Sequence, residues 1–169
     1  MNISIITAMT ANKTIGLSCG LPWKIKQELL YFQKNTLNKV VIMGSNTFAS
    51  INYKPLINRQ NIVLTKNPKK FQDFKQIENH DNLHFVTDVT NSLNLAENFY
   101  NSGSVIPEIM IIGGREIYQQ FLPLVNKLYI SIIKNNYPGD IYFPEFNIND
   151  WRLESSIDQE EFIANIYVK

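Results

Sequence analysis

The sequence predicts a single α/β domain over residues 1–169, built on a mostly parallel central sheet of about eight strands. Two observations favour this class. Short apolar runs alternate with stretches of helical composition, and most runs are apolar on both faces, which is typical of strands covered by helices on both sides. The length of 169 residues, of which 44% are hydrophobic, suffices for one core. We therefore expect one domain with about four flanking helices.

The elements can be placed in order along the chain. The predicted strands are Ile3–Met9, Val40–Met43, Ile62–Leu64, Phe85–Val86, Ile109–Ile112 and Leu128–Ile133. The predicted helices between them are Ile25–Asn35, Ser45–Ser50, Ser92–Tyr100 and Glu116–Leu122. The tail differs, because Pro138 and Gly139 are typical of the centre of a type II turn and Phe162–Val168 has strand composition. We expect an antiparallel strand at the C-terminal edge.

Charge and cysteine content narrow the possible partners. The formal net charge is +1, so no basic excess is present to bind a nucleic-acid backbone. Cys19 is the only cysteine, which rules out an internal disulfide and fits a reducing compartment. Nowhere do 18 apolar residues run together, and the first apolar run lacks the features of a signal peptide. We expect a soluble cytoplasmic monomer that binds small molecules and neither nucleic acid nor membrane.

A carboxylate interrupts the apolar face of the first predicted helix. Ile25, Glu28, Leu29 and Phe32 have the spacing of one buried face. Burying an unpaired carboxylate is costly, so Glu28 needs a partner, which can be a ligand, or a use for a raised pKa. The alternative is a slightly rotated helix with Glu28 at its rim, paired with Lys24 one turn earlier. Nearby Trp23, taken alone, is more typical of core packing.

Two strand-to-helix junctions suggest phosphate binding. Gly44 ends one strand, and a residue of 45–47 can cap the following helix; Gly113 and Gly114 precede another helix. Each junction directs backbone N–H groups to the same edge of a parallel sheet, and two anion sites suggest a dinucleotide. The alternative is that the glycines only form tight corners. No G-x-G-x-x-G motif occurs, so the ordinary Rossmann site is excluded.

Taken together, these residues resemble the dihydrofolate reductase family. The residues that carry the resemblance, in the family's order and approximate spacing, are Ile15, Gly16, Leu21, Pro22, Trp23, Glu28, Val41–Gly44, Arg59, Ile112–Gly114, Tyr118, Gly139 and Asp140. The resemblance covers residues 2–169. It implies the fold of that family and reduction of 7,8-dihydrofolate to tetrahydrofolate by NADPH, with hydride to C6 and a proton to N5, in support of one-carbon and thymidylate metabolism.

The resemblance implies a role for each substrate-site residue. Glu28 would be the ionisable group of the pterin pocket, with Ser131 hydrogen-bonded to it from behind. Trp23 would hold an ordered water, and Leu21 would lie on a mobile loop that closes over the nicotinamide. Arg59 would bind the glutamate carboxylate of the substrate, whereas by itself it would be read as a surface arginine. The residues implied to line the pterin and aminobenzoyl cleft are Ile6, Thr7, Phe32, Ile51 and Leu56.

The resemblance also implies a site for NADPH. Its implied residues are Ala8, Ile15, Gly16, Gly44, Ser45, Asn46, Thr47, Leu64, Thr65, Lys66, Ile112, Gly113, Gly114, Arg115, Glu116, Ile117 and Tyr118. Thr65 and Lys66 would flank the adenosine 2′-phosphate. The family commonly joins Gly113 and Gly114 by a cis peptide bond, which is rare away from proline.

Three positions depart from the family pattern. Ser45 stands where relatives often place an arginine against the 2′-phosphate, which bears on the preference for NADPH. Ser131 replaces the usual threonine but keeps the hydroxyl, and only two glycines precede Arg115 where some bacterial members have three.

Other functions are weighed beside this one. His80 and His84 are four residues apart, but a loop with a strand beginning at Phe85 is favoured there, and no metal site is predicted. The rival functions are a pyrimidine reductase of riboflavin synthesis with the same fold and a non-catalytic nucleotide-binding module.

Overall fold

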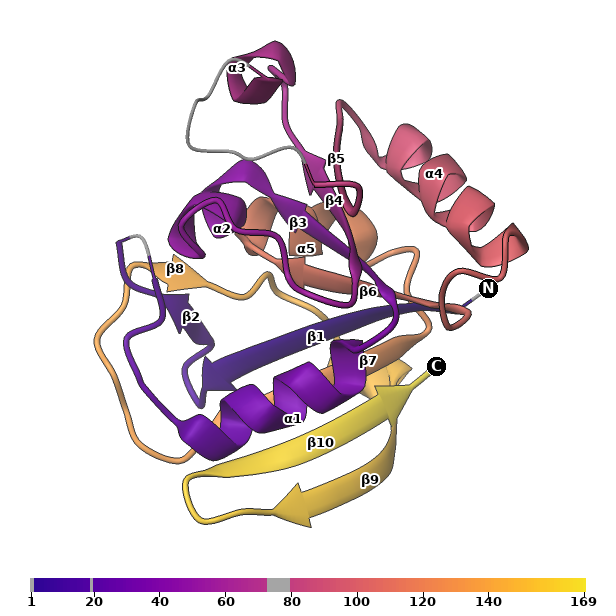
Figure 1. Ribbon diagram of the computed structural model, residues 1–169. Coiled ribbons are helices and arrows are strands. Elements are labelled where there is room, and N and C mark those ends of the chain that lie inside the picture. Colours follow the sequence, from indigo (N-terminus) through magenta and orange to yellow (C-terminus); the bar gives the residue numbers. More distant parts are fainter. Residues whose placement is uncertain (1, 19, 73–79) are drawn as a thin grey trace.

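Within the part of the chain that the computed structural model describes, residues 2–18, 20–72 and 80–169, eight strands form one sheet (Figure 1). Cys19 lies outside the described residues. The strands, in their order across the sheet, are β5 (Leu83–Val86), β4 (Gln60–Leu64), β3 (Val40–Gly44), β6 (Glu108–Gly113), β1 (Asn2–Thr10), β7 (Lys127–Ile133), β10 (Phe162–Val168) and β9 (Arg152–Asp158). All neighbours from β5 to β7 are parallel, whereas β10 is antiparallel to both β7 and β9. The α/β class and the antiparallel C-terminal edge are confirmed.

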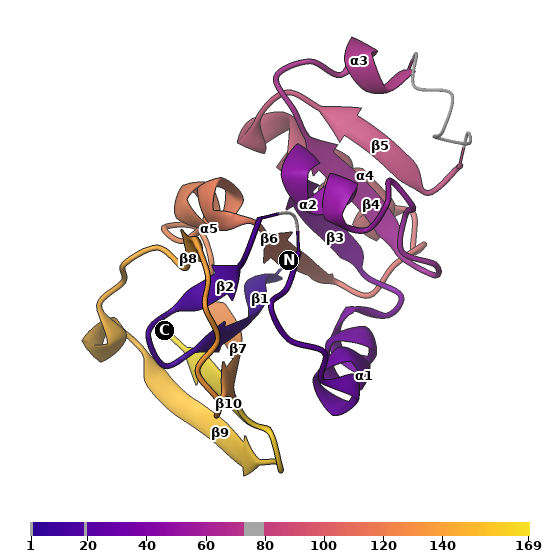
Figure 2. The same cartoon turned by 90° about the vertical axis from the view of Figure 1, so that its left-hand side faces the viewer.

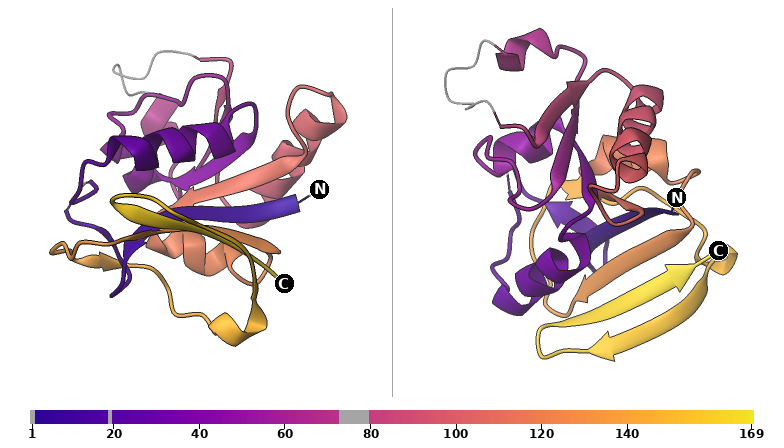
Figure 3. Two further views of the ribbon diagram at one scale, coloured as in Figure 1. Left: turned by 90° about the horizontal axis from the view of Figure 1, so that it is seen from below. Right: turned by 45° about the vertical axis from the view of Figure 1, so that its right-hand side comes forward.

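The helices cover both faces of this sheet. They are α1 (Lys26–Thr36), α2 (Ser45–Ser50), α3 (Lys69–Gln72), α4 (Val89–Asn101) and α5 (Arg115–Phe121), followed by the 3-10 turn η1 (Ile148–Asp150). Figure 3 shows α1 and α5 on opposite sides of the strands. No described helix is both long and apolar enough to cross a membrane.

The strands that are apolar on both faces contribute side chains to a hydrophobic cluster on each face of the sheet. In β1, Ile5 packs with residues of α4 and α5, while the next residue, Ile6, packs on the other face in a cluster that contains Phe48 of α2 and Phe71 of α3. Successive side chains of a strand point to opposite faces, so one run of apolar residues supplies both layers. This confirms the interpretation of such runs as strands covered on both sides.

Several predicted bounds move by one to three residues. The helix predicted at 92–100 begins at Val89, because the Asp88 side chain caps it by accepting a hydrogen bond from the Asn91 amide at 2.8 Å. The strand predicted from Phe85 begins at Leu83, so His84 lies in β5 and not in a loop. No strand was predicted at β2 (Thr14–Gly16), β8 (Ile141–Tyr142) or β9, and no helix was predicted at α3.

The type II turn predicted at Pro138 and Gly139 is wrong. Gly139 does not have the positive φ that this turn requires of its third residue. The glycine is needed for packing, because a Cβ there would lie 2.1 Å from Cγ2 of Thr14 and 2.7 Å from the carbonyl oxygen of Gly16. The loop thereby packs against β2 (Thr14–Gly16), which pairs with β8 (Ile141–Tyr142) in a small antiparallel sheet (Figure 2).

A carboxylate is held inside the fold near the start of β6. Glu108 accepts hydrogen bonds from the hydroxyls of Ser4 at 2.6 Å and Tyr129 at 3.2 Å, and it forms an ion pair with Lys39. Burial alone would raise the pKa of Glu108, but these three donors and the charge of Lys39 outweigh burial and hold the pKa below its ordinary value. This network links β1, β6 and β7 at the end of the sheet opposite Gly44 and Gly113.

Candidate active site

Glu28 lies in the first turn of α1 and faces inward. The residue is only 7% exposed, and burial raises the pKa of its carboxyl group. The hydroxyl of Ser131 on β7 partly offsets this rise, although its Oγ makes no regular hydrogen bond to any described residue. Glu28 forms no ion pair with Lys24 within the described chain, so the alternative of a paired rim carboxylate is wrong.

The buried face of α1 differs from the prediction at one position. Leu29 was expected inside, but it is 54% exposed, whereas Glu28 and Thr36 are buried and Phe32 is half-buried. These three residues are four apart, so they follow one stripe, and Leu29 lies about 100° further round the helix. The half-buried Tyr31 and Asn35 flank this stripe on the side away from Leu29, so the buried face is rotated relative to the predicted one and Glu28 lies in its middle instead of at its edge.

Trp23 carries a further polar group without a described partner. The residue is 4% exposed, and its Nε1 is buried without a hydrogen-bond partner among the described residues. A buried donor without a partner indicates a place for a water or a ligand atom. Leu21, in contrast, is 57% exposed on the segment that leads into α1. This agrees with the loop position implied for Leu21, but no interaction assigns its role.

The apolar residues implied for the substrate cleft lie together. Ile6, Phe32, Ile51 and Leu56 belong to one cluster, although they come from β1, α1 and the segment after α2. Thr7 follows Ile6 on β1 and is 5% exposed. The charge of Glu28 acts on Tyr118. Burial is the larger cause and the Glu28 carboxylate a further cause of the raised pKa of Tyr118 on α5.

Arg59 is buried, so its interpretation as a solvated surface residue is wrong. Its Nε donates to Oγ1 of Thr36 at 2.9 Å, and its Nη atoms donate to the carbonyl oxygens of Ile57 at 2.6 Å and Gln33 at 3.2 Å. An arginine has five N–H donors, so two remain, and no described carboxylate pairs with it. Burial lowers its pKa, but a guanidinium stays charged. A ligand carboxylate fits this cation.

Sequence reasoning missed the three residues that hold Arg59. Thr36 and Gln33 lie at the end of α1, and Ile57 lies in the connection to β4. A local pattern does not reveal them, because two of the three contacts use backbone carbonyl oxygens, which every residue carries. Only the position of Thr36, eight residues after Glu28 on the same helix face, was available as a signal.

The two glycine junctions lie against each other at the carboxyl ends of β3 and β6. A Cβ on Gly44 would approach Cγ1 of Ile117 to 3.0 Å, and one on Gly114 would lie 3.5 Å from Oγ1 of Thr47. Gly113 and Gly114 are joined by a cis peptide bond, as the resemblance implied. The predicted side-chain cap of α2 is wrong, because Gly44 is the N-cap residue and no side chain caps the helix.

Gly113 is the more constrained of the two neighbouring glycines. Its φ is +108°, a value that side chains disfavour, and a Cβ would lie 2.9 Å from the hydroxyl of Tyr118. That hydroxyl donates to the carbonyl oxygen of Ile6 at 3.0 Å and so ties α5 to β1. Gly114, by contrast, has only an ordinary contact beyond its chain neighbours, which leaves its backbone open to a ligand.

The remaining residues implied for the cofactor lie at the ends of other strands. Ala8 is near the end of β1, Ile15 and Gly16 are in β2, Ile112 is in β6, and Leu64 ends β4. Thr65 follows and its amide donates to the carbonyl oxygen of Val86 at 2.9 Å. The exposed residues of the implied set are Asn46, Lys66, Arg115 and Glu116, while Ser45 is half-buried.

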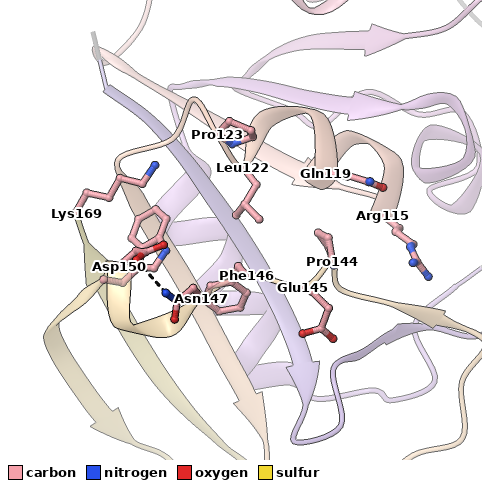
Figure 4. Close-up of a pocket in the computed structure, with 11 residues that line it drawn as sticks. Arg115, Gln119, Leu122, Pro123, Pro144, Glu145, Phe146, Asn147, Asp150 and Lys169 are labelled. Atoms are coloured by element: carbon pink, nitrogen blue, oxygen red, sulfur yellow. Dashed lines mark hydrogen bonds between the residues drawn. The ribbon is translucent and has the colours of Figure 1, made fainter.

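A hollow of about 560 Å³ beside α5 does not contain the substrate residues (Figure 4). The side chain of Arg115 lines it together with Gln119, Phe146, Trp151 and Lys169. None of Glu28, Trp23 and Arg59 contributes to it. The residues implied for the substrate therefore lie elsewhere, on α1, β1 and β7 and on the segments next to them.

A family model that matches nearly the whole chain shows to which protein family it belongs. The family model described as dihydrofolate reductase matches residues 2–167. The chain belongs to the dihydrofolate reductase family. The dihydrofolate reductase of Buchnera aphidicola subsp. Baizongia pistaciae is 39% identical to it, over 99% of this chain and 94% of the relative. The dihydrofolate reductase of Bacillus subtilis is 38% identical, over 91% of this chain and 82% of the relative.

Solved structures of dihydrofolate reductase have the same fold. The enzyme from Enterococcus faecalis, in complex with NADP(H) and RAB-propyl, superimposes with a TM-score of 0.79 at 25% sequence identity. The match covers 98% of this chain and 93% of that one. The dihydrofolate reductase fold predicted from the resemblance is thus confirmed.

Proposed function

We propose that the protein reduces 7,8-dihydrofolate to 5,6,7,8-tetrahydrofolate with NADPH as the hydride donor. The observation that carries the proposal is a pair of opposite charges beside the two ends of α1. Among the described residues, Glu28 is a buried carboxylate without a cationic partner, and Arg59 is a buried guanidinium with two N–H groups that make no hydrogen bond. A substrate with a proton-donating ring at one end and a carboxylate at the other satisfies both groups.

Glu28 acts on the ring. Its carboxylate accepts hydrogen bonds from the 2-amino group and the adjacent ring N–H, and its negative charge favours the protonated form of the substrate. Nε1 of Trp23 has no described partner and holds the water from which N5 obtains its proton. Ile6 and Phe32 pack against the apolar part of the substrate and exclude further water.

The residues at the carboxyl ends of β3 and β6 fit a dinucleotide. The backbone of Gly114 is open to a ligand, and Thr47 lies beside it. Gly44, Ser45 and Asn46 would hold one part of the pyrophosphate, and Thr65 with Lys66 the 2′-phosphate. The bound cofactor supplies a hydride, which becomes bonded to C6 while N5 gains a proton and NADPH becomes NADP⁺. Binding and orientation are the tasks of the protein.

We infer that the protein works as a cytoplasmic monomer on small molecules, without nucleic acid or a membrane as partner. The formal net charge of +1 supports the expectation that nucleic acid is not a partner, because it provides no general attraction to polyanions.

The proposal is tested by the loss of NADPH absorbance with the purified protein. Dihydrofolate is expected to start the oxidation of NADPH, and tetrahydrofolate is expected as the product. The ribosylaminopyrimidine ketone of riboflavin synthesis is expected to give no reaction. A reaction with that pyrimidine alone would indicate the pyrimidine reductase. NADPH binding without oxidation on either addition would indicate a nucleotide-binding module.

A further inference from the structure

The ring of Trp23 is in contact with a tyrosine from a distant loop. The centroids of Trp23 and Tyr137 are 5.7 Å apart, and their planes are inclined at 58°. Tyr137 lies in the loop between β7 and β8, more than a hundred residues further along the chain. An aromatic pair with this distance and tilt is attractive and restricts how each ring can turn.

The contact closes an apolar cluster around the indole. Trp23 packs there with Ile25, Ile133 and Phe162, and half-buried Tyr137 lies on the cluster. A side chain that is 4% exposed and enclosed in this way has few rotamers available to it. Its Nε1 has no partner among the described residues, so hydrogen bonding does not fix the indole. Packing alone fixes the direction of this N–H group.

The same loop holds the other end of the segment that carries Trp23. The amide of Asp140 donates to the carbonyl oxygen of Gly16 at 3.1 Å, and Oδ1 of Asp140 accepts from the amide of Ser18 at 3.0 Å. In Figures 1 and 2 the connection from β7 to β8 runs beside the segment between β2 and α1. In the described part of the chain, the loop is joined by hydrogen bonds to Gly16 and Ser18, and it contacts Trp23 through the ring of Tyr137.

We propose that Tyr137 is a positioning residue, which holds the indole of Trp23 so that its Nε1–H stays directed at the water beside the substrate. This inference rests on the proposed function. Tyr137 acts through Trp23. Removing its ring leaves the indole free to turn, which lowers the turnover rate but not the affinity for NADPH.

The test is a double-mutant cycle between Tyr137→Ala and Trp23→Phe. Tyr137→Ala is expected to lower kcat for dihydrofolate roughly fivefold in the parent but less than about twofold in Trp23→Phe, because that variant has no N–H left to position. Tyr137→Phe keeps the ring and is expected to have the parental kcat. Equal losses in both backgrounds, or a parental kcat for Tyr137→Ala, would overturn the proposal.

A spectroscopic measurement separates positioning from folding and from the proposed function. The chain has two tryptophans, so Trp151→Phe leaves Trp23 as the only emitter. In that background Tyr137→Ala is expected to shift the emission to longer wavelength and Tyr137→Phe to leave it unchanged. Tyr142→Ala is the matched control. Tyr142 is 39% exposed, and its hydroxyl donates a hydrogen bond to the carbonyl oxygen of Gly139. Among the described residues its ring does not contact Trp23, which pairs with Tyr137. Unchanged emission in Tyr137→Ala contradicts the contact.

A partly unfolded Tyr137→Ala variant does not end the test. Tyr137→Leu keeps apolar volume in the cluster, and a melting temperature close to the parent's shows that folding is intact. A folded Tyr137→Leu variant with parental kcat and emission would overturn the proposal. If the parent does not oxidise NADPH with dihydrofolate, the proposed function fails, whereas the emission of the variants still decides whether Tyr137 fixes Trp23.

Discussion

Replacing Glu28 with glutamine removes the negative charge of the cleft and changes little else. Glu28 is 7% exposed and forms no ion pair with a described residue, so its charge is available to the substrate. Each hydrogen bond to a charged acceptor is worth about 1.3 kcal/mol more than one to a neutral acceptor. Two such bonds to the ring amount to about 2.6 kcal/mol, which corresponds to nearly a 10²-fold loss of turnover.

The assay is the oxidation of NADPH with dihydrofolate over a range of pH. The rate of Glu28→Gln is expected to recover in part at low pH, where solvent protonates N5 without help, and its NADPH affinity is expected to stay parental. Glu28→Asp is expected to be much milder, because it keeps the charge. Glu97→Gln removes an exposed carboxylate on α4 and serves as the control. A Glu28→Gln variant with parental turnover near neutral pH would refute the reasoning.

The same substitution has a consequence for stability. The pKa of Glu28 is raised in the folded protein, so folding is opposed once the pH exceeds the ordinary glutamate pKa of about 4.3, and the opposition is complete above the raised pKa. Glu28→Gln is therefore expected to raise the melting temperature at neutral pH and to have little effect at acidic pH. Equal melting curves at neutral pH would show that burial of the carboxylate costs nothing.

Three further predictions concern other parts of the structure. The lowered pKa of Glu108 makes its contribution to stability present above the ordinary pKa and lost as the pH falls through the lowered one. In denaturant titrations Glu108→Gln should lower the free energy of unfolding by roughly 2 kcal/mol at neutral pH and by much less in strong acid. Ser45→Arg should tighten NADPH binding by about 1.5 kcal/mol with little change for NADH, and added salt should reduce the gain; equal gains for both cofactors would contradict the 2′-phosphate assignment. Gly113→Ala should unfold at clearly lower temperature than Gly114→Ala, because only Gly113 combines a φ of +108° with a close side chain, and the reverse order would contradict this.

The sequence predicted features that repeat with the period of a helix or strand. Strand β1 could be recognised because its apolar side chains fill both cores, and Glu28 stood out because a carboxylate occupied a helix position meant for an apolar side chain. The glycines at 113 and 114 were found because a strand ended there and a helix began. These signals lie in neighbouring residues of the chain, so they could be recognised without knowledge of the tertiary structure.

What the sequence did not predict depends on contacts between distant segments. Leu29 is exposed because the buried face of α1 is rotated away from it toward Tyr31 and Asn35, and the composition of the helix does not specify this rotation. Gly139 was interpreted through turn conformation, yet it is required by close packing against Thr14, 125 residues earlier. The burial of Arg59 could not be predicted, because it depends on the carbonyl oxygens of Ile57 and Gln33, which the fold brings to its guanidinium. Such constraints come from tertiary structure and leave no periodic pattern.

The most direct test of the proposed reaction follows the hydride itself. NADPH that carries deuterium at the transferable position is mixed with the protein and dihydrofolate, and the tetrahydrofolate formed is examined by NMR. The account predicts deuterium at C6 of the product and an exchangeable solvent proton at N5. In Glu28→Gln both should appear more slowly, and to the same extent. Bound NADPH that transfers no deuterium to C6, or label that ends on another carbon, would contradict it.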